Sequence, residues 1–187
     1  PDVLNLWRYI YEAIGRANML LANVDNNTDI DIAYRDQVRG EALFLRAYYY
    51  FMLVQFFENV PMYLTPVANH TQVDVPATPA KEVYEQIIAD METAEALVAP
   101  ISEIGFGGRV SKSAVRGILA RVCLNMAGRP VQDISKYERA SYWAKKVMDD
   151  NVAAHALNPD YTDVFIKYAR DEYDIKESIW EVELWGY

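Results

Sequence analysis

Cysteine and histidine are nearly absent from this chain of 187 residues, which holds one Cys and two His. A lone cysteine forms neither an internal disulfide nor a cysteine-based zinc site. Cys123 lies in an apolar stretch, where it is expected to be a small buried side chain. His70 and His155 fall in loop-like segments at no recognisable spacing. The sequence therefore predicts no metal site, no Cys–His nucleophile and no cofactor.

Positive charge is also scarce, because 18 Lys and Arg stand against 27 Asp and Glu, a net charge of −9. No basic stripe runs along the chain, and binding to a phosphate backbone needs one. Nucleic acid is therefore excluded as a partner. Nothing selects a catalytic pair among the acidic residues, and residues 105–108 lack the preceding strand and the Lys-Ser/Thr of a phosphate loop. The sequence predicts a protein that is not an enzyme.

Long hydrophobic runs are missing as well. The most apolar window extends from position 42 to position 57 and includes Arg46 and Gln55. A membrane-spanning helix needs about 20 apolar residues, so none is predicted. The chain begins with Pro1 and Asp2 in a helical pattern rather than in the pattern of a signal peptide.

Helical periodicity runs through almost the whole chain. Ser111 is a predicted N-cap, as is Thr78 before Pro79, and Ser135 with Glu138 has the spacing of a capping box. The final segment alternates like a strand. The helices are expected over residues 2–24, 31–57, 79–99, 111–127, 135–150 and 160–168, and the strand over 178–185.

The expected fold is mainly α, with stacked tetratricopeptide-like hairpins in an α–α superhelix and a short extended segment at the C-terminus. We interpret residues 1–187 as one helical domain, a lobe of something larger, with a long loop at 58–77 and a partly irregular tail at 152–187. Residues 111–151 resemble one tetratricopeptide unit, with Tyr137, Ala140 and Ala144 as the packing step of its second helix.

The helix over residues 31–57 is predicted to be the central one. From position 42 to position 57 every side chain except Arg46 and Gln55 is apolar, so this part must be surrounded by other elements. A buried arginine needs a partner, and Glu41, Glu12 and Asp90 are the candidates for Arg46.

Several stretches together resemble the SusD/RagB family, in the family's order and over most of the chain. The segment 39–61, RGEALFLRAYYYFMLVQFFENVP, is very close to the family's "GEA.FLRA..YF.L…GdvP". One departure is Glu58, which stands where the family has glycine; a non-Gly residue implies a turn without positive φ or some backbone strain. The other similar stretches are residues 7–24, 82–97, 108–125, 140–147, 157–165 and 177–183.

The resemblance implies a lipid-anchored binding protein on the outer face of the bacterial outer membrane. Such proteins capture oligosaccharides, or in some members peptides, and deliver them to a TonB-dependent transporter of the SusC type. Family members are two to three times longer, and the signal and lipidated cysteine that the family implies are expected to lie outside this chain. The alternative from the residues alone is a tetratricopeptide-type adaptor that binds a peptide.

The long loop is the first candidate binding region, because loops of this length between core helices often carry function. The simpler interpretation of this loop is that it packs over the scaffold or contacts the transporter. For Trp180 and Trp185 in the tail, the simpler interpretation is packing in the core or at an interface. The candidate ligand residues are Tyr63, Asn69, His70, Gln72 and Asp74 in the loop, and Trp180 and Trp185 in the tail. The expected structural motif residues are Arg39, Glu41, Arg46, Pro61 and Arg109.

Overall fold

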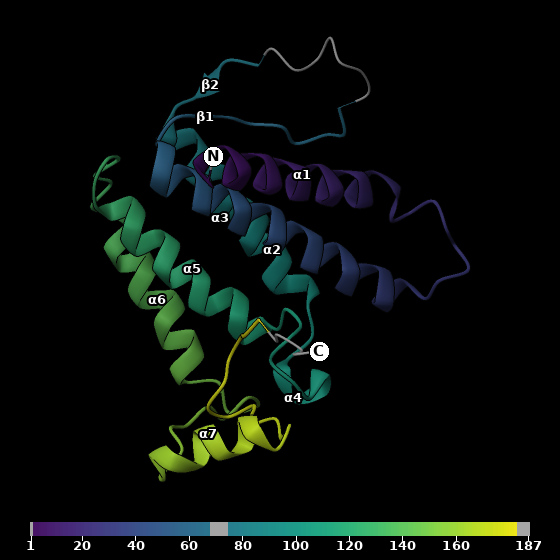
Figure 1. Cartoon of the computed structure of the whole chain (residues 1–187), viewed down its shortest axis with the longest axis vertical. Coiled ribbons are helices and arrows are strands. Elements are labelled where there is room, and N and C mark those ends of the chain that lie inside the picture. The colour runs from purple at the N-terminus through teal and green to yellow at the C-terminus, as the bar shows by residue number, and fades with distance from the viewer. Residues whose placement is uncertain (1, 68–74, 183–187) are drawn as a thin grey trace.

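The computed structural model describes residues 2–67 and 75–182 of the chain, and these residues are mainly helical, as predicted. Figure 1 shows the order of the elements along the chain. They are α1 (Asp2–Asn23), α2 (Ile32–Phe57), β1 (Val60–Pro61), β2 (Ala77–Thr78), α3 (Ala80–Leu97), α4 (Ile101–Ile104), α5 (Lys112–Ala127), α6 (Lys136–Met148) and α7 (Tyr161–Ala169).

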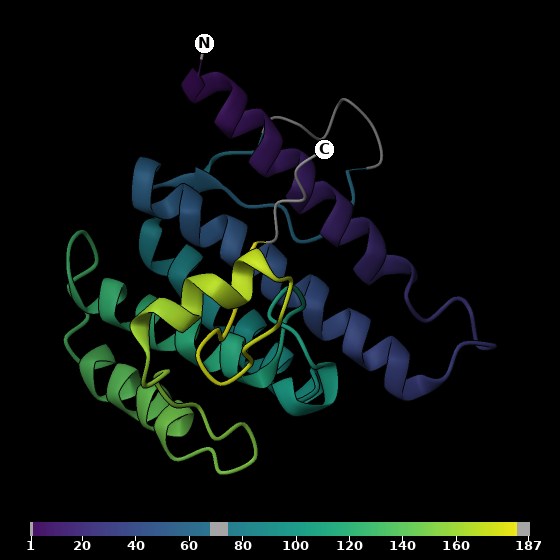
Figure 2. The ribbon, with the colours of Figure 1, turned by 60° about the horizontal axis from the view of Figure 1, so that its bottom comes forward.

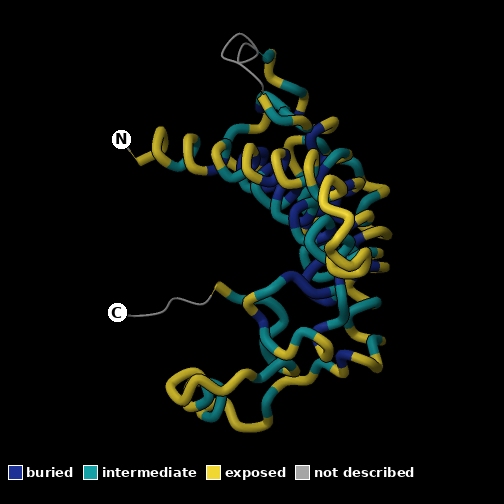
Figure 3. Tube along the Cα trace, turned by 90° about the vertical axis from the view of Figure 1, so that its right-hand side faces the viewer, coloured by how far each residue is buried: buried dark blue, intermediate teal, exposed yellow. Residues whose placement is uncertain are grey.

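The long helices pack in sequence order: α1 on α2, α2 on α3, α3 on α5 and α5 on α6. Successive helices joined by a turn therefore form hairpins that lie side by side (Figures 1 and 2). Seen edge-on in Figure 3, the molecule is a crescent with α1 near one tip and α7 near the other. No helix within the described ranges is both long enough and apolar enough to cross a membrane.

The predicted central helix is α2, in which every residue from Ala42 to Val54 is buried or half-buried, whereas Gln55 and Phe56 at its end are exposed. Phe44, Ala47, Leu53 and Val54 are each at most 1% exposed. Full burial of a large apolar side chain contributes about 1.5–3 kcal/mol, so this helix holds the stack together. On α3, the predicted face of Val83, Ile87, Met91 and Ala94 is buried against it.

The predicted N-caps divide into one that the structure confirms and two that it contradicts. Ser111 accepts the amide N–H of Ala114 at 3.2 Å, as predicted. The capping box of Ser135 is wrong: this residue is already helical, with φ −61° and ψ −21°. Its hydroxyl donates to Asp133 at 2.5 Å instead.

The predicted cap at Thr78 is also wrong, because β2 holds this residue in an extended pairing with Val60 of β1. The helix begins two residues later, at Ala80. The N–H of Ala80 donates to the side-chain oxygen of Asn59 at 2.8 Å. A side chain from the end of the preceding helix therefore satisfies the orphan donor at the start of α3.

Glu58, the family departure, makes its turn with a positive φ of 59°. It is the C-cap residue of α2, and its N–H donates to the carbonyl of Val54. Glycine reaches this conformation at no steric cost, whereas a side chain there costs of order 1 kcal/mol or more. Of the two outcomes that the sequence left open, the strained turn is the one present.

The face of α6 that packs against α5 differs from the expected one. Ala140 and Trp143 are buried against α5, whereas Tyr137 is 52% exposed and Ala144 is exposed. The inner face instead follows Lys136, Ala140, Trp143 and Val147, which are buried or half-buried at helical spacing. The helix boundaries were predicted correctly, but its inner face was not.

The tail lacks the predicted strand over its described part, residues 178–182. Instead, a single backbone hydrogen bond joins the N–H of Glu181 to the carbonyl of Gly107 at 3.1 Å. The predicted helix at 160–168 is present as α7, and Asp160 caps it by accepting the N–H of Thr162. No residue of α7 is buried. Sequence reasoning missed the single-turn helix α4.

Candidate functional site

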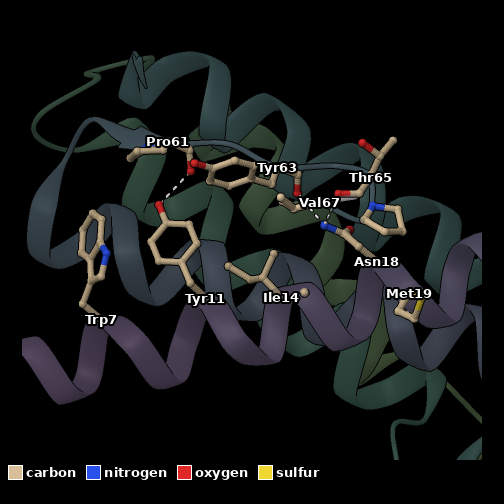
Figure 4. A pocket seen from close by; sticks show the side chains of 11 residues that line it. Trp7, Tyr11, Ile14, Asn18, Met19, Pro61, Tyr63, Thr65 and Val67 are labelled. Carbon is tan, nitrogen blue, oxygen red and sulfur yellow. Dashed lines mark hydrogen bonds between the residues drawn. The ribbon is translucent and has the colours of Figure 1, made fainter. Parts of the chain in front are cut away.

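A groove of ≈ 650 Å³ lies between α1 and the segment that follows β1 (Figure 4). The side chains of α1 project toward residues 61–67, which form the opposite wall. We call this space the α1 groove. Its lining residues are Trp7, Tyr11, Ile14, Gly15, Asn18, Met19, Pro61, Tyr63, Thr65, Pro66 and Val67.

Aromatic rings form one end of the α1 groove. Trp7 and Tyr11 are four residues apart, so they lie on the same face of α1, and their ring centroids are 4.9 Å apart. Phe57 contacts Trp7 edge-on at 4.9 Å, and Tyr63 contacts Tyr11 edge-on at 6.0 Å. Trp7 and Tyr11 are only half-buried, so packing fixes these rings while parts of them stay accessible.

The opposite wall is tied to the helices through its backbone carbonyls. The hydroxyl of Tyr11 donates to the carbonyl of Pro61 at 2.7 Å. The hydroxyl of Tyr50 donates to the carbonyl of Tyr63 at 3.0 Å and accepts its N–H at 2.6 Å. Asn18 donates to the same carbonyl at 2.9 Å. The groove is therefore preformed, because one side is helix α1 and the other is hydrogen-bonded to α1 and α2.

A buried ion pair lies behind this wall. Arg46 donates from Nε and Nη2 to the two carboxylate oxygens of Asp90 at 2.8 and 2.9 Å, so Asp90 is the partner among the three candidates. Its Nη1 donates to Asn18 at 2.9 Å and to the carbonyl of Leu64 at 3.1 Å. Gln86 donates to Asp90 as well. The pair connects α2 and α3 to α1 and to the wall of the groove.

The hydroxyls of Tyr11 and Tyr50 stay protonated at neutral pH. Burial raises the pKa of Tyr11, with smaller effects from Tyr50 and Tyr63. Burial also raises the pKa of Tyr50 to about 12. Both hydroxyls can therefore donate the hydrogen bonds described above. Because none of the described lining residues carries a carboxylate, an imidazole, a thiol or an amine, the described part of the groove offers no acid–base pair.

Of the candidate ligand residues, the structure places Tyr63 in the α1 groove. Asn69, His70, Gln72, Asp74 and Trp185 lie outside the described residues. The structure does not bring Trp180 to the groove. Trp180 packs edge-on against Phe44 and Tyr48 of α2, each at 5.1 Å.

The expected motif residues form ion pairs and one strand contact. Arg109 donates to both oxygens of Glu41 at 3.0 and 3.1 Å. Arg39 pairs with Asp25 at the turn between α1 and α2. Pro61 lies in β1, and its carbonyl accepts from Tyr11.

Sequence reasoning missed Trp7, Tyr11 and Asn18, which supply the α1 side of the groove. A signal was present for two of them, since a Trp and a Tyr at an interval of four residues share a helix face. For Asn18, the signal was an amide on the apolar face that Ile14 and Ala17 define, because a polar group there needs a buried partner. In the described parts of the chain, no three His, Cys, Asp or Glu residues form a group that could hold a metal ion.

Stacked helical hairpins place this chain in the class of helical-repeat proteins, and an aromatic-lined groove lies along the first helix. The chain belongs to the SusD-like family, described as starch-binding and associating with the outer membrane, whose model matches residues 2–124. The resemblance noted in the sequence is thereby confirmed. The family description concerns binding and not catalysis, which agrees with the expectation that the chain is not an enzyme.

Similar proteins support the same family. SusD-like protein P2 of Formosa agariphila is 27% identical over 96% of this chain and 34% of its own length. A SusD homolog from Bacteroides thetaiotaomicron has a TM-score of 0.88 at 28% identity, over 99% of this chain and 36% of that chain. A structure described as a laminarin-binding SusD-like protein has a TM-score of 0.74 at 26% identity, over 86% and 34%. The chain spans about a third of the length of these relatives.

Proposed function

We propose that this chain is the helical part of a surface binding protein that captures oligosaccharides in the α1 groove. Family membership and the laminarin-binding relative support a glycan as the ligand. The observation that carries the site is the pair of half-buried rings, Trp7 and Tyr11, with Tyr63 beside them. Sugar rings present apolar C–H faces, and accessible aromatic faces bind such surfaces.

The same proposal includes delivery of the captured glycan to a TonB-dependent transporter of the SusC type. The family is described as associating with the outer membrane, which is where such a transporter lies. A lipid anchor would hold the protein on the extracellular face. A peptide ligand is the alternative, since the lining of the groove is mostly apolar.

Replacement of one groove ring tests the site. Trp7→Ala removes the larger ring, and Tyr9→Ala is the matched control because Tyr9 is 68% exposed on the same helix and does not line the groove. Binding of maltopentaose, laminaripentaose and a panel of neutral oligosaccharides is measured by titration in NMR spectra. We expect the dissociation constant to rise about tenfold or more in Trp7→Ala, equal to roughly 1.4 kcal/mol, and to change less than twofold in Tyr9→Ala.

Two outcomes would contradict the proposed site. If both variants bind as the unmodified chain does, the glycan binds elsewhere. If no glycan binds while an apolar peptide does, the peptide-binding alternative is correct.

A further inference from the structure

The described side chains that line the α1 groove carry no charge. The lining set contains tyrosine, tryptophan, aliphatic residues, glycine, two prolines, one threonine and one asparagine, but no Asp, Glu, Lys, Arg or His. The amide of Asn18 is 1% exposed and already bonded to the wall. The accessible surface of the groove is therefore aromatic and aliphatic among the described residues, with isolated polar groups such as the indole N–H of Trp7 and the hydroxyl of Thr65.

The charges of the Arg46–Asp90 pair behind the wall are not available to a ligand. Arg46 lies behind the wall with 8% of its side chain exposed, and its three donor nitrogens bond to Asp90, Asn18 and Leu64. Asp90 is 7% exposed and neutralises it. An anion in the groove would find no free cation among these residues.

An acidic sugar is therefore disfavoured for two reasons. A carboxylate or sulfate would lose hydration in an apolar groove without gaining a paired cation. The chain also has a net charge of −9, which repels an anionic ligand at low ionic strength. A neutral sugar loses only hydroxyl hydration, part of which the polar groups at the rim replace, and its C–H face stacks on the rings.

The length of the groove indicates an oligosaccharide rather than a single sugar. The lining side chains on α1 extend from Trp7 at one end to Met19 at the other. With a rise of about 1.5 Å for each position, this stretch is a path of ~18 Å along the helix axis. The adjacent rings of Trp7 and Tyr11, tilted by 47° to each other, occupy one end of this path, so a ligand that uses the whole groove must continue beyond them.

We infer that the α1 groove selects uncharged oligosaccharide segments that lie along α1, and that it rejects uronic-acid and sulfated sugars. This inference rests on the proposed function, because it names the class of glycan that the same groove takes. It makes two separable claims, one on ligand charge and one on ligand length.

The charge claim is tested by comparing laminaripentaose with penta-galacturonate on the 187-residue chain. Trp7 provides a local probe, because its indole N–H gives one of four indole signals in an NMR spectrum and Trp7→Phe identifies it. We expect the neutral pentasaccharide to shift this signal with a dissociation constant that changes less than twofold between 20 and 300 mM NaCl. We expect at least tenfold weaker binding of the uronate.

A cation introduced into the groove tests whether affinity for an acidic sugar can be gained. Met19→Lys places an amine in the groove, where Met19 is 54% exposed. Met148→Lys is the matched control, since Met148 is 83% exposed on α6 and the net charge changes equally. The ratio of uronate to neutral affinity is expected to rise at least fivefold in Met19→Lys and to stay within twofold in Met148→Lys.

The outcomes separate this inference from the proposed function. Uronate binding that is as tight as neutral binding, with a shift at Trp7, overturns the charge claim and leaves glycan capture intact. Glucose that binds as tightly as the pentasaccharide overturns the length claim. If none of the sugars shifts the Trp7 signal, glycan capture in this groove is wrong, and the inference fails with it.

Discussion

Arg46 shows at the scale of one residue how the core and the groove depend on each other. Its guanidinium bonds to Asp90 of α3, to Asn18 of α1 and to the backbone of Leu64 in the wall. A buried ion pair contributes little beyond what an apolar pair of the same shape would. It does, however, fix the relative position of three elements and the wall.

Removal of one partner of this pair is expected to be costly. Arg46→Met leaves the carboxylate of Asp90 buried without its cation, so we expect a loss of about 3–5 kcal/mol in the free energy of unfolding. The double variant Arg46→Met with Asp90→Leu is expected to recover most of that loss. Urea denaturation measures both values. A loss below about 1 kcal/mol in the single variant would show that the charge of Asp90 is compensated elsewhere.

We expect the buried phenol of Tyr84 to make the folded chain less stable at high pH. Burial raises the pKa of this phenol from 10.0 to about 12 in the folded chain. The folded state then retains the proton that the unfolded state releases, so the stabilisation is fully present below pH 10 and is lost as the pH rises toward 12. The loss from Tyr84 is on the order of 2 kcal/mol.

Tyr84→Phe is the control for this titration, because it keeps the packed ring and removes the ionisable group. Urea unfolding of both proteins between pH 9 and pH 12 should show a shallower decline in the variant. Parallel declines would mean that Tyr84 does not cause the loss. Other tyrosines, such as Tyr50, keep a residual slope in both proteins.

At the scale of elements, the position of a helix follows from local pattern, whereas its cap contacts do not, and on α6 neither does its inner face. The long helices lie where the apolar periodicity predicted them. Thr78 and Ser135 are suitable cap residues, yet the start of α3 is satisfied by Asn59 and Ser135 bonds to Asp133. The reason is that a cap depends on backbone angles that the neighbouring element sets.

Two glycines within helices differ in what an added methyl group would contact, so one reports on helix packing and the other on helix propensity. A Cβ built on Gly40 of α2 would lie 2.7 Å from the side chain of Val98 and 3.0 Å from that of Leu97, at the crossing with α3. A Cβ on Gly117 of α5 would meet nothing within 4 Å. The glycine at position 40 therefore permits the close approach of α2 and α3.

We expect opposite signs from alanine at these positions. Gly117→Ala should stabilise the chain by about 0.5–1 kcal/mol, since alanine is the better helix former. Gly40→Ala should destabilise it by about 1–2 kcal/mol, because overpacking exceeds the gain in propensity. Thermal and urea unfolding give both values. If Gly40→Ala is as stabilising as Gly117→Ala, the α2–α3 contact is looser than described.

At the scale of the whole molecule, the tail is attached to the crescent at few places. Trp180 lies edge-on against Phe44 and Tyr48, and Glu181 bonds to Gly107. The helix α7 buries none of its residues, and polar contacts such as Lys167 with Asp174 organise its surroundings. The indole of Trp180 and the ring of Tyr173, which contacts Phe106 at 5.6 Å, are thus apolar attachments of the described tail.

Loss of this indole should release the tail while leaving the helical stack folded. In Trp180→Ala, we expect the amide of Glu181 to exchange with solvent at least tenfold faster, with a global loss of only about 1–2 kcal/mol. Tyr161→Ala is the control, since Tyr161 is 78% exposed on α7. Hydrogen exchange read by NMR measures the effect. An unchanged rate at Glu181 would show that other contacts hold the tail.

The sequence by itself determined the helical class, the central position of α2 and the family, because apolar periodicity and a contiguous motif are local properties of the chain. Only the tertiary structure decided which acid pairs with Arg46, how the wall of the groove is held, and that Tyr11 of the first helix meets Tyr63 beyond the second. These contacts depend on where helices cross. For Arg46, the carboxylates of Glu12, Glu41 and Asp90 were chemically equivalent partners in the sequence. The packing of α2 on α3 places the carboxylate of Asp90 within hydrogen-bonding distance.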